Sequence, residues 1–277
     1  MTAMMKRLFT AALLPLFCFP LSAQQQSGLL QQAMDYALKD SLEQAEQCFR
    51  KVLKADPNSS RNALIFSNLG TVQRRMGKID EAIQSYSLAL NITPYATSIL
   101  LNRAAAYLDR GNLDKAYLDY CNVIDLLPDN VEARLFRAYI YMQRRKYDEA
   151  RIDYNTILVK KMDYKPARLG IILLDQNEGQ LGKARDGIDL LIHDHPDDYE
   201  LYKVRANIAL DMKLPDAALI DLETAARLNR KDRETFILLG DVHLQLDNPK
   251  AARKAFNKAI ELGVSPVELK SRLKQCR

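Results

Sequence analysis

An internal period of 34 residues constrains the fold of this chain more than any other feature. Alanine recurs at that spacing, at Ala82, Ala116, Ala150, Ala184, Ala218 and Ala252. Four residues further along, a bulky residue recurs in step with it, at Tyr86, Tyr120, Tyr154, Ile188, Leu222 and Phe256. Both halves of each unit place apolar residues at i, i+3, i+4 and i+7, the pattern of an amphipathic helix. The period therefore predicts stacked repeats, each a pair of helices that buries its apolar face against its neighbours.

Glycine and proline mark the turns of these units. Gly77, Gly111 and Gly179 stand at the fifteenth residue of their units, where a first helix must end in the left-handed conformation. Pro215 and Pro249 stand two residues further on in theirs, in the first turn of a second helix, where the missing N–H costs nothing.

Some units lack these turn-forming residues. Arg145 replaces the glycine in one unit, and Met162, Arg230 and Val264 replace the proline that ends other units, such as Pro94. We expect longer or less abrupt turns at these places, without the loss of a repeat.

The chain resembles the tetratricopeptide repeat family, because one unit carries the family pattern at Phe66, Leu69, Gly70, Ala82, Tyr86 and Pro94. The resemblance implies an all-α fold, a right-handed α-solenoid of about seven helix-turn-helix repeats with a C-terminal capping helix. The repeat domain is expected at residues 24–266, with repeats at 26–59, 63–96, 97–130, 131–164, 165–198, 199–232 and 233–266. The capping helix is expected at 267–277, with Pro266 at its first turn. Below, each repeat is numbered from 1 to 34.

The first residues predict export. Lys6 and Arg7 precede an apolar run, and small residues end it at Ala23, as in a secretory signal peptide cleaved after that residue. The run at 8–21 contains two prolines and is too short to span about 30 Å of hydrocarbon. Residues 1–23 are therefore expected to be removed, leaving a protein of the Gram-negative periplasm that does not span the membrane.

Charge and cysteine content exclude two other classes of protein. Removing Lys6 and Arg7 from 40 basic residues leaves 38 against 35 acidic ones, a net charge of +3 that is too mild to indicate a nucleic-acid partner. The remaining cysteines, Cys48, Cys121 and Cys276, are odd in number and widely spaced, which does not fit a disulfide framework.

No catalytic constellation is evident. The histidines are His193, His195 and His243, and the sequence has no glycine-rich phosphate loop, nucleophile elbow, CxxC pair or HExxH motif. His193 and His195 lie beside aspartates and could hold a metal, but a solvated turn is the simpler interpretation. We therefore expect no enzyme activity, no metal and no small-molecule cofactor.

The resemblance places the first helix of each repeat on the concave side, with positions 2, 5, 9 and 12 exposed. The candidate partner-binding residues on or beside these positions are Asn68, Leu101, Asn102, Leu108, Leu135, Tyr139, Met142, Leu169 and Leu173. This apolar groove predicts a scaffold or adaptor of the cell envelope that binds a protein or peptide, either an extended segment or a helix. Asn68 and Asn102 either bond a peptide backbone or only solvate the helix face. An envelope accessory that recognises lipid or glycan is the alternative function, and an enzyme is the least favoured.

Three arginines interrupt the apolar stripe at position 7, and in the same three repeats position 23 is aspartate. The residues are Arg103 with Asp119, Arg137 with Asp153 and Arg205 with Asp221. The four repeats that lack the arginine also lack the aspartate. We therefore predict that each arginine bonds its aspartate bidentately between the two helices, half-buried. In the alternative, the arginines extend to solvent and never meet the aspartates.

Overall fold

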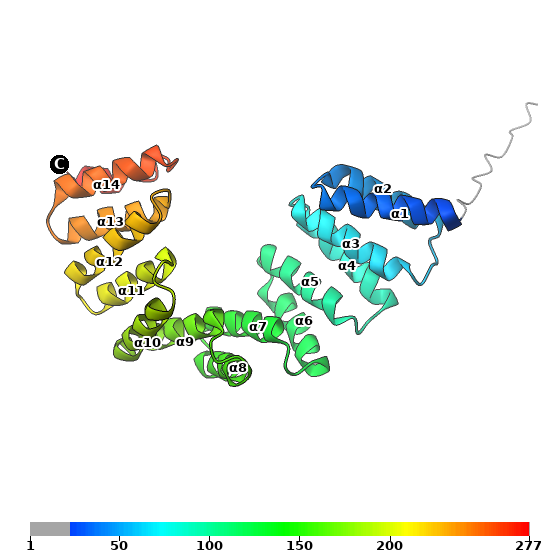
Figure 1. Ribbon diagram of the computed structural model, residues 1–277, viewed down its shortest axis with the longest axis horizontal. Helices are drawn as coiled ribbons and strands as arrows, with labels where there is room; N and C mark the ends of the chain where they lie inside the picture. The colour runs from blue at the N-terminus through cyan, green and yellow to red at the C-terminus, as the bar shows by residue number, and fades with distance from the viewer. Residues whose placement is uncertain (1–22, 277) are drawn as a thin grey trace, which may run out of the picture. The chain divides into compact units, whose positions relative to one another are not determined.

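The computed structural model describes residues 23–276, which form fifteen helices and no strand (Figure 1). The all-α fold class is therefore confirmed. The predicted signal sequence lies outside the described residues, except for Ala23, the first residue of helix α1.

The helices follow one another in pairs, each joined by a short turn. The pairs are α1 (Ala23–Leu38) with α2 (Leu42–Ala55), α3 (Asn62–Arg75) with α4 (Ile79–Ile92), α5 (Thr97–Asp109) with α6 (Leu113–Leu126), α7 (Val131–Gln143) with α8 (Tyr147–Lys160), α9 (Lys165–Asn177) with α10 (Leu181–Asp194), α11 (Tyr199–Asp211) with α12 (Pro215–Leu228), and α13 (Arg233–Gln245) with α14 (Pro249–Glu261). The short helix α15 (Lys270–Gln275) follows the last pair. The first pair begins at Ala23, slightly before the expected start of its repeat.

The chain divides into two compact units, Met1–Asp119 and Tyr120–Arg277, and the boundary falls inside α6. In the first unit, the helices from α1 to α4 each pack against the next helix of the chain. In the second unit the same order holds from α7 to α15. Within the units, a first helix thus lies between its own second helix and the second helix of the preceding pair, as α3, α9, α11 and α13 do.

The periodic residues form the core of each pair. The six periodic alanines are buried, and so are the six bulky residues that follow them. Their rings need a small residue on the facing helix: a Cβ built on Gly70 would lie 2.9 Å from Cδ1 of Tyr86, and one on Gly240 would lie 2.2 Å from Cε1 of Phe256. Because burying each large side chain contributes about 1.5–3 kcal/mol, this repeated contact accounts for the regularity of the pairs.

The turns inside the pairs correct one expectation. Gly77, Gly111 and Gly179 all have φ of +76°, as expected for helix-ending glycines. Arg145 has φ of +56° and adopts the same left-handed conformation, so the turn from α7 to α8 is no longer than the others. The expectation of a longer turn was wrong because a non-glycine residue tolerates this conformation at a cost of about 1 kcal/mol.

The expectation for the turns between pairs was also wrong at Met162 and Arg230. The helices there are separated by residues 161–164 and 229–232, equivalent to residues 93–96 around Pro94. Backbone bonds close these turns without proline, and before α13 the Asp232 side chain also accepts the N–H of Thr235. At Val264 the turn does differ from the equivalent turns, because the preceding helix α14 already ends at Glu261.

The C-terminal helix is shorter than expected. Residues 266–269 form turns, so Pro266 precedes α15 and is not at its first turn. Ser265 accepts a hydrogen bond from the N–H of Val267, a local turn that competes with helix formation. Leu269 and Cys276 are nevertheless buried against the cluster around Phe256, so the segment covers the last pair.

Candidate functional site

The structure brings each position-7 arginine to its aspartate. Nε and Nη2 of Arg103 donate to the two carboxylate oxygens of Asp119, both at 2.8 Å. The other two pairs repeat this geometry, Arg137 with Asp153 at 2.8 and 2.8 Å, and Arg205 with Asp221 at 2.9 and 2.6 Å. Each contact is the planar two-bond arrangement in which guanidinium matches carboxylate best.

In each of these ion pairs the aspartate is buried. The aspartate side chains are only 4%, 1% and 7% exposed, in chain order. The hydrogen bonds that Arg103 donates to Asp119 raise the pKa of Arg103 against the opposing effect of burial, and the other two arginines behave likewise. The arginines therefore do not extend freely to solvent.

A third contact of the arginines was missed by the sequence reasoning. In each case Nη1 donates to the second helix of the preceding pair, to a residue 16 positions earlier in the chain. The acceptors are Ser87 Oγ at 3.1 Å from Arg103, Cys121 Sγ at 3.6 Å from Arg137, and Asp189 Oδ1 at 2.7 Å from Arg205. Each arginine thus connects three helices, and we call this contact the arginine link. Its acceptors share no residue type, so the sequence carried no signal for them.

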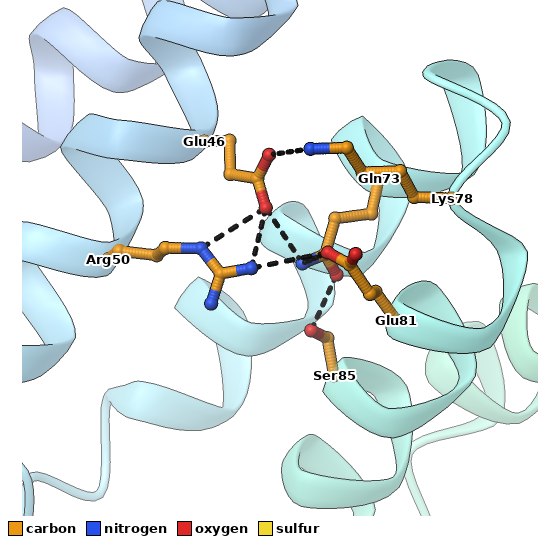
Figure 2. Close-up of polar contacts among 6 residues, drawn as sticks. All are labelled: Glu46, Arg50, Gln73, Lys78, Glu81 and Ser85. Atoms are coloured by element: carbon orange, nitrogen blue, oxygen red, sulfur yellow. Dashed lines mark hydrogen bonds and ion pairs between the residues drawn. The ribbon is translucent and has the colours of Figure 1, made fainter.

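A different polar cluster joins the first two pairs, where the arginine link is absent (Figure 2). Glu46 on α2 is buried and accepts bonds from Arg50 at 2.6 and 3.1 Å, from Lys78 at 2.8 Å and from Gln73 at 3.1 Å. Gln73 in turn accepts the hydroxyl of Ser85 at 2.7 Å. Burial alone would raise the pKa of Glu46, but the hydrogen bonds from Lys78, Gln73 and Arg50 outweigh it and lower the pKa to about 2.

The second unit contains a similar cluster in which a basic residue, Arg151, takes the place of the acidic Glu46. Arg151 occupies position 21, as Glu46 does, and donates to Asp175 on α9 at 2.7 Å and to Glu178, the residue after α9, at 2.6 Å. Asp175 occupies position 11, as Gln73 does. Because the charges are exchanged between repeats, no single residue pattern could reveal these contacts in advance.

One register position of the predicted groove is occupied by a buried ion cluster. Lys203, at position 5, contacts the carboxylates of Glu234 at 2.6 Å and of Glu200 and Asp232 at 3.1 Å. Burial would lower the pKa of Lys203, but the bonds to these carboxylates raise it. In this repeat the position serves contact between neighbouring pairs.

The candidate partner-binding residues fall in both units and are described as two sets. In the first unit, Asn68 lies on α3, and Leu101, Asn102 and Leu108 lie on α5, all half-buried. In the second unit, the set comprises Leu135, Tyr139 and Met142 on α7 and Leu169 and Leu173 on α9.

Several side chains of the second set pack against the hydrophobic core. Leu135 and Met142 pack against the buried cluster that includes Tyr154, and Leu169 packs against the cluster that includes Ile188. Tyr139 is the most accessible member, at 46% exposed. Since α7 and α9 contact each other, Tyr139 stands on a surface that continues onto the neighbouring pair.

Within residues 23–276, no group of three or more histidine, cysteine, aspartate or glutamate side chains is placed to hold a metal ion. His193 is exposed and lies 3.4 Å from Asp194 on the same turn. None of the described helices is both long and apolar enough to cross a membrane.

The paired helices and their shared core define a helical-repeat protein. The tetratricopeptide repeat model matches residues 30–99, 68–126, 101–164 and 203–263, more than half of the chain. The chain therefore belongs to the tetratricopeptide repeat family. Repeats of this family generally act as protein-interaction scaffolds and are typically non-catalytic.

Solved structures agree with this assignment. A tetratricopeptide repeat protein from Parabacteroides merdae ATCC 43184 is 30% identical, with a TM-score of 0.82, over 91% of this chain and 99% of that chain. PilF of Pseudomonas aeruginosa is 18% identical, with a TM-score of 0.62 over 79% of this chain and 97% of that chain. A chain of the APC/C heterotetramer Cut9–Hcn1 is 15% identical, with a TM-score of 0.64 over 92% of this chain and 57% of that chain. The last two similarities concern the fold alone. No curated protein matches the chain.

Proposed function

We propose that the protein is an exported, non-catalytic scaffold or adaptor of the cell envelope. In this proposal it binds a protein or peptide segment on the surface of α7 and α9 around Tyr139. The family assignment supports protein binding in general, and the exposed apolar surface supports this particular location.

The single observation that carries the location is the exposure of Tyr139. It lies on one stripe of α7 with Leu135 and Met142, at spacings of four and three residues. A tyrosine offers a large, rigid surface with a polar tip and loses little side-chain entropy on binding. The half-buried neighbours pack against the core and hold the backbone of α7 in place.

Export is proposed from the sequence. A basic start, an apolar run and the small residues ending at Ala23 predict that the mature protein begins at Gln24. Intact-mass measurement of the protein from its native cells tests this, and a mass that retains Met1 or Lys6 contradicts it.

The binding surface is tested with a matched pair of variants. Tyr139→Glu places a charge on the proposed surface, whereas Ile152→Glu places one on α8 of the same pair, where Ile152 is 63% exposed. We expect Tyr139→Glu to weaken partner binding at least about tenfold, because a central aromatic often contributes 2 kcal/mol or more, while Ile152→Glu leaves binding unchanged.

A photo-crosslinking amino acid introduced at residue 139 or 152 identifies the partner before affinity is measured. Crosslinked product from residue 139 and not from residue 152 is expected. If both variants keep the melting temperature and only Ile152→Glu loses binding, the partner binds the face of α8 and the proposed surface is wrong.

A further inference from the structure

The last helix pair lacks the arginine link and is hollow where the link would be. Leu239 and Ala255 stand where the preceding pair has Arg205 and Asp221. The pocket between α12, α13 and α14 has a volume of about 470 Å³, whereas the equivalent pocket between α10, α11 and α12 has about 290 Å³. Two short apolar side chains have replaced a guanidinium and its carboxylate, which leaves the larger space.

The pocket has an apolar lining with one unsatisfied polar atom. Phe236, Leu239, Ala251 and Ala255 supply the apolar surface. His243 also lines the pocket, and its Nδ1 is buried with no hydrogen-bond partner among residues 23–276. Buried polar atoms normally have a partner, so this atom makes His243 a polar position in an otherwise apolar wall.

The α14 side of the pocket is basic. Lys254 and Lys258 line it, and Lys254 has no acidic partner in the described part of the chain. Glu261 is paired with Lys258 at 2.8 Å, so Lys254 supplies the unpaired positive charge on this side. Glu223 on α12 lies on the opposite side and repels carboxylates there, which directs an acidic occupant toward α14.

The charge around the pocket extends over the whole C-terminal segment. Residues 246–277 contain eight lysines and arginines and three acidic residues, a net charge of +5. The entire chain also has +5, so residues 1–245 sum to zero. The positive charge of the protein is therefore concentrated around its last helix pair, where it attracts acidic partners.

We propose that the pocket between α12, α13 and α14 binds an acidic segment of a partner protein, which inserts one bulky apolar side chain. The apolar side chain fills the space over Leu239 and Ala255. Carboxylates on either side of it face Lys254 and Lys258. This surface is separate from the one around Tyr139 and takes a partner of different chemistry.

Three labelled peptides with blocked ends test the chemistry by fluorescence anisotropy on the mature protein. The first has two glutamates on each side of a phenylalanine, the second replaces the phenylalanine with serine, and the third replaces the glutamates with lysines. Only the first is expected to bind, and its binding weakens as salt is added. Equal binding of the serine peptide, or binding of the lysine peptide, overturns the proposal.

Two lysine variants test the location. Lys254→Glu reverses a charge in the pocket, and Lys270→Glu makes the same change in α15, outside it. Lys254→Glu is expected to weaken binding of the phenylalanine peptide about tenfold, since it removes one attraction and adds one repulsion. Equal weakening by both variants means diffuse attraction to a basic surface and overturns the proposed pocket.

A double substitution fills the space. Leu239→Arg with Ala255→Asp rebuilds the pair seen at Arg205 and Asp221, with Glu223 positioned as Asp189 is. This variant is expected to keep its helicity and to lose peptide binding. Unchanged binding in the folded double variant overturns the proposal, and Lys254→Glu decides if the double variant does not fold. Tyr139→Glu leaves peptide binding unchanged, which separates this surface from the other.

Discussion

Removing Asp119 tests how the buried arginine links act on stability. Asp119→Ala leaves the guanidinium of Arg103 with the hydroxyl of Ser87 and the ring of Tyr107, 5.8 Å away, but with no opposite charge. Stripping one partner from a well-buried ion pair costs about 3–5 kcal/mol. Because the Arg103 side chain is 21% exposed and can recover some hydration, we expect a loss near the lower end, about 3 kcal/mol.

The double variant should be more stable than either single variant. Arg103→Leu with Asp119→Ala reproduces the natural combination of Leu239 and Ala255 in the last pair. It removes both charges, so no buried charge is left without a partner, and the expected loss is about 1 kcal/mol. Arg103→Leu alone leaves the Asp119 carboxylate buried and should cost at least as much as Asp119→Ala.

The assay is urea unfolding followed by circular dichroism, with hydrogen exchange of the α5 and α6 amides to locate the change. Arg110→Leu and Asp80→Ala serve as the control cycle, because that pair has a 2.7 Å contact but lies exposed at the surface. The control should show a coupling of no more than about 1 kcal/mol. Additive losses at Arg103 and Asp119, within about 0.5 kcal/mol, would refute the reasoning.

Three further predictions concern single positions. The pKa of Glu46 falls from 4.5 to about 2 on folding. Its ionised carboxylate therefore contributes about 3 kcal/mol to the free energy of unfolding above pH 4.5, and this contribution is lost as the pH falls toward 2. Stability curves of wild type and Glu46→Gln that stay parallel over this range would contradict it. Gly240→Ala puts a Cβ against the Phe256 ring and should destabilise the protein by about 1–3 kcal/mol. Gly28→Ala in α1 places its Cβ in open space and should stabilise the protein by about 0.5–1 kcal/mol in the same urea assay. Arg145→Gly relieves the left-handed conformation and should raise the free energy of unfolding by up to about 1 kcal/mol; a fall would mean that the arginine side chain contributes more than the strain costs.

The fold was readable from the sequence because its signals repeat. Ala82 and its equivalents, and Tyr86 and its equivalents, recur at one period and report the same buried contact each time. Arg103 and Asp119 were readable for a related reason, since the two types vary together from repeat to repeat. Arg145 was misjudged because residue type alone does not show that the neighbouring helices can hold a left-handed turn.

The contacts that the sequence did not reveal are those whose residue types change. Ser87, Cys121 and Asp189 accept the same arginine bond with three different side chains. The cluster around Glu46 reappears around Arg151 with the charges exchanged. Such contacts depend on the distance between two helices, and a pattern of residue types carries no information about that distance.

The same location, where a first helix meets the second helices on either side of it, is filled in different ways along the chain. Leu69 leaves room for the network of Gln73 and Ser85, Arg103 spans the location with its guanidinium, and Leu239 leaves it open. The planar guanidinium of arginine carries donors on two sides, so it bonds both neighbours at once. Because the desolvation cost offsets much of the attraction, such a link adds little net stability. Its main effect is to hold the spacing of three helices, which explains why a charge stands on an apolar stripe and why the pocket at Leu239, where the link is absent, is larger than the one at Arg205.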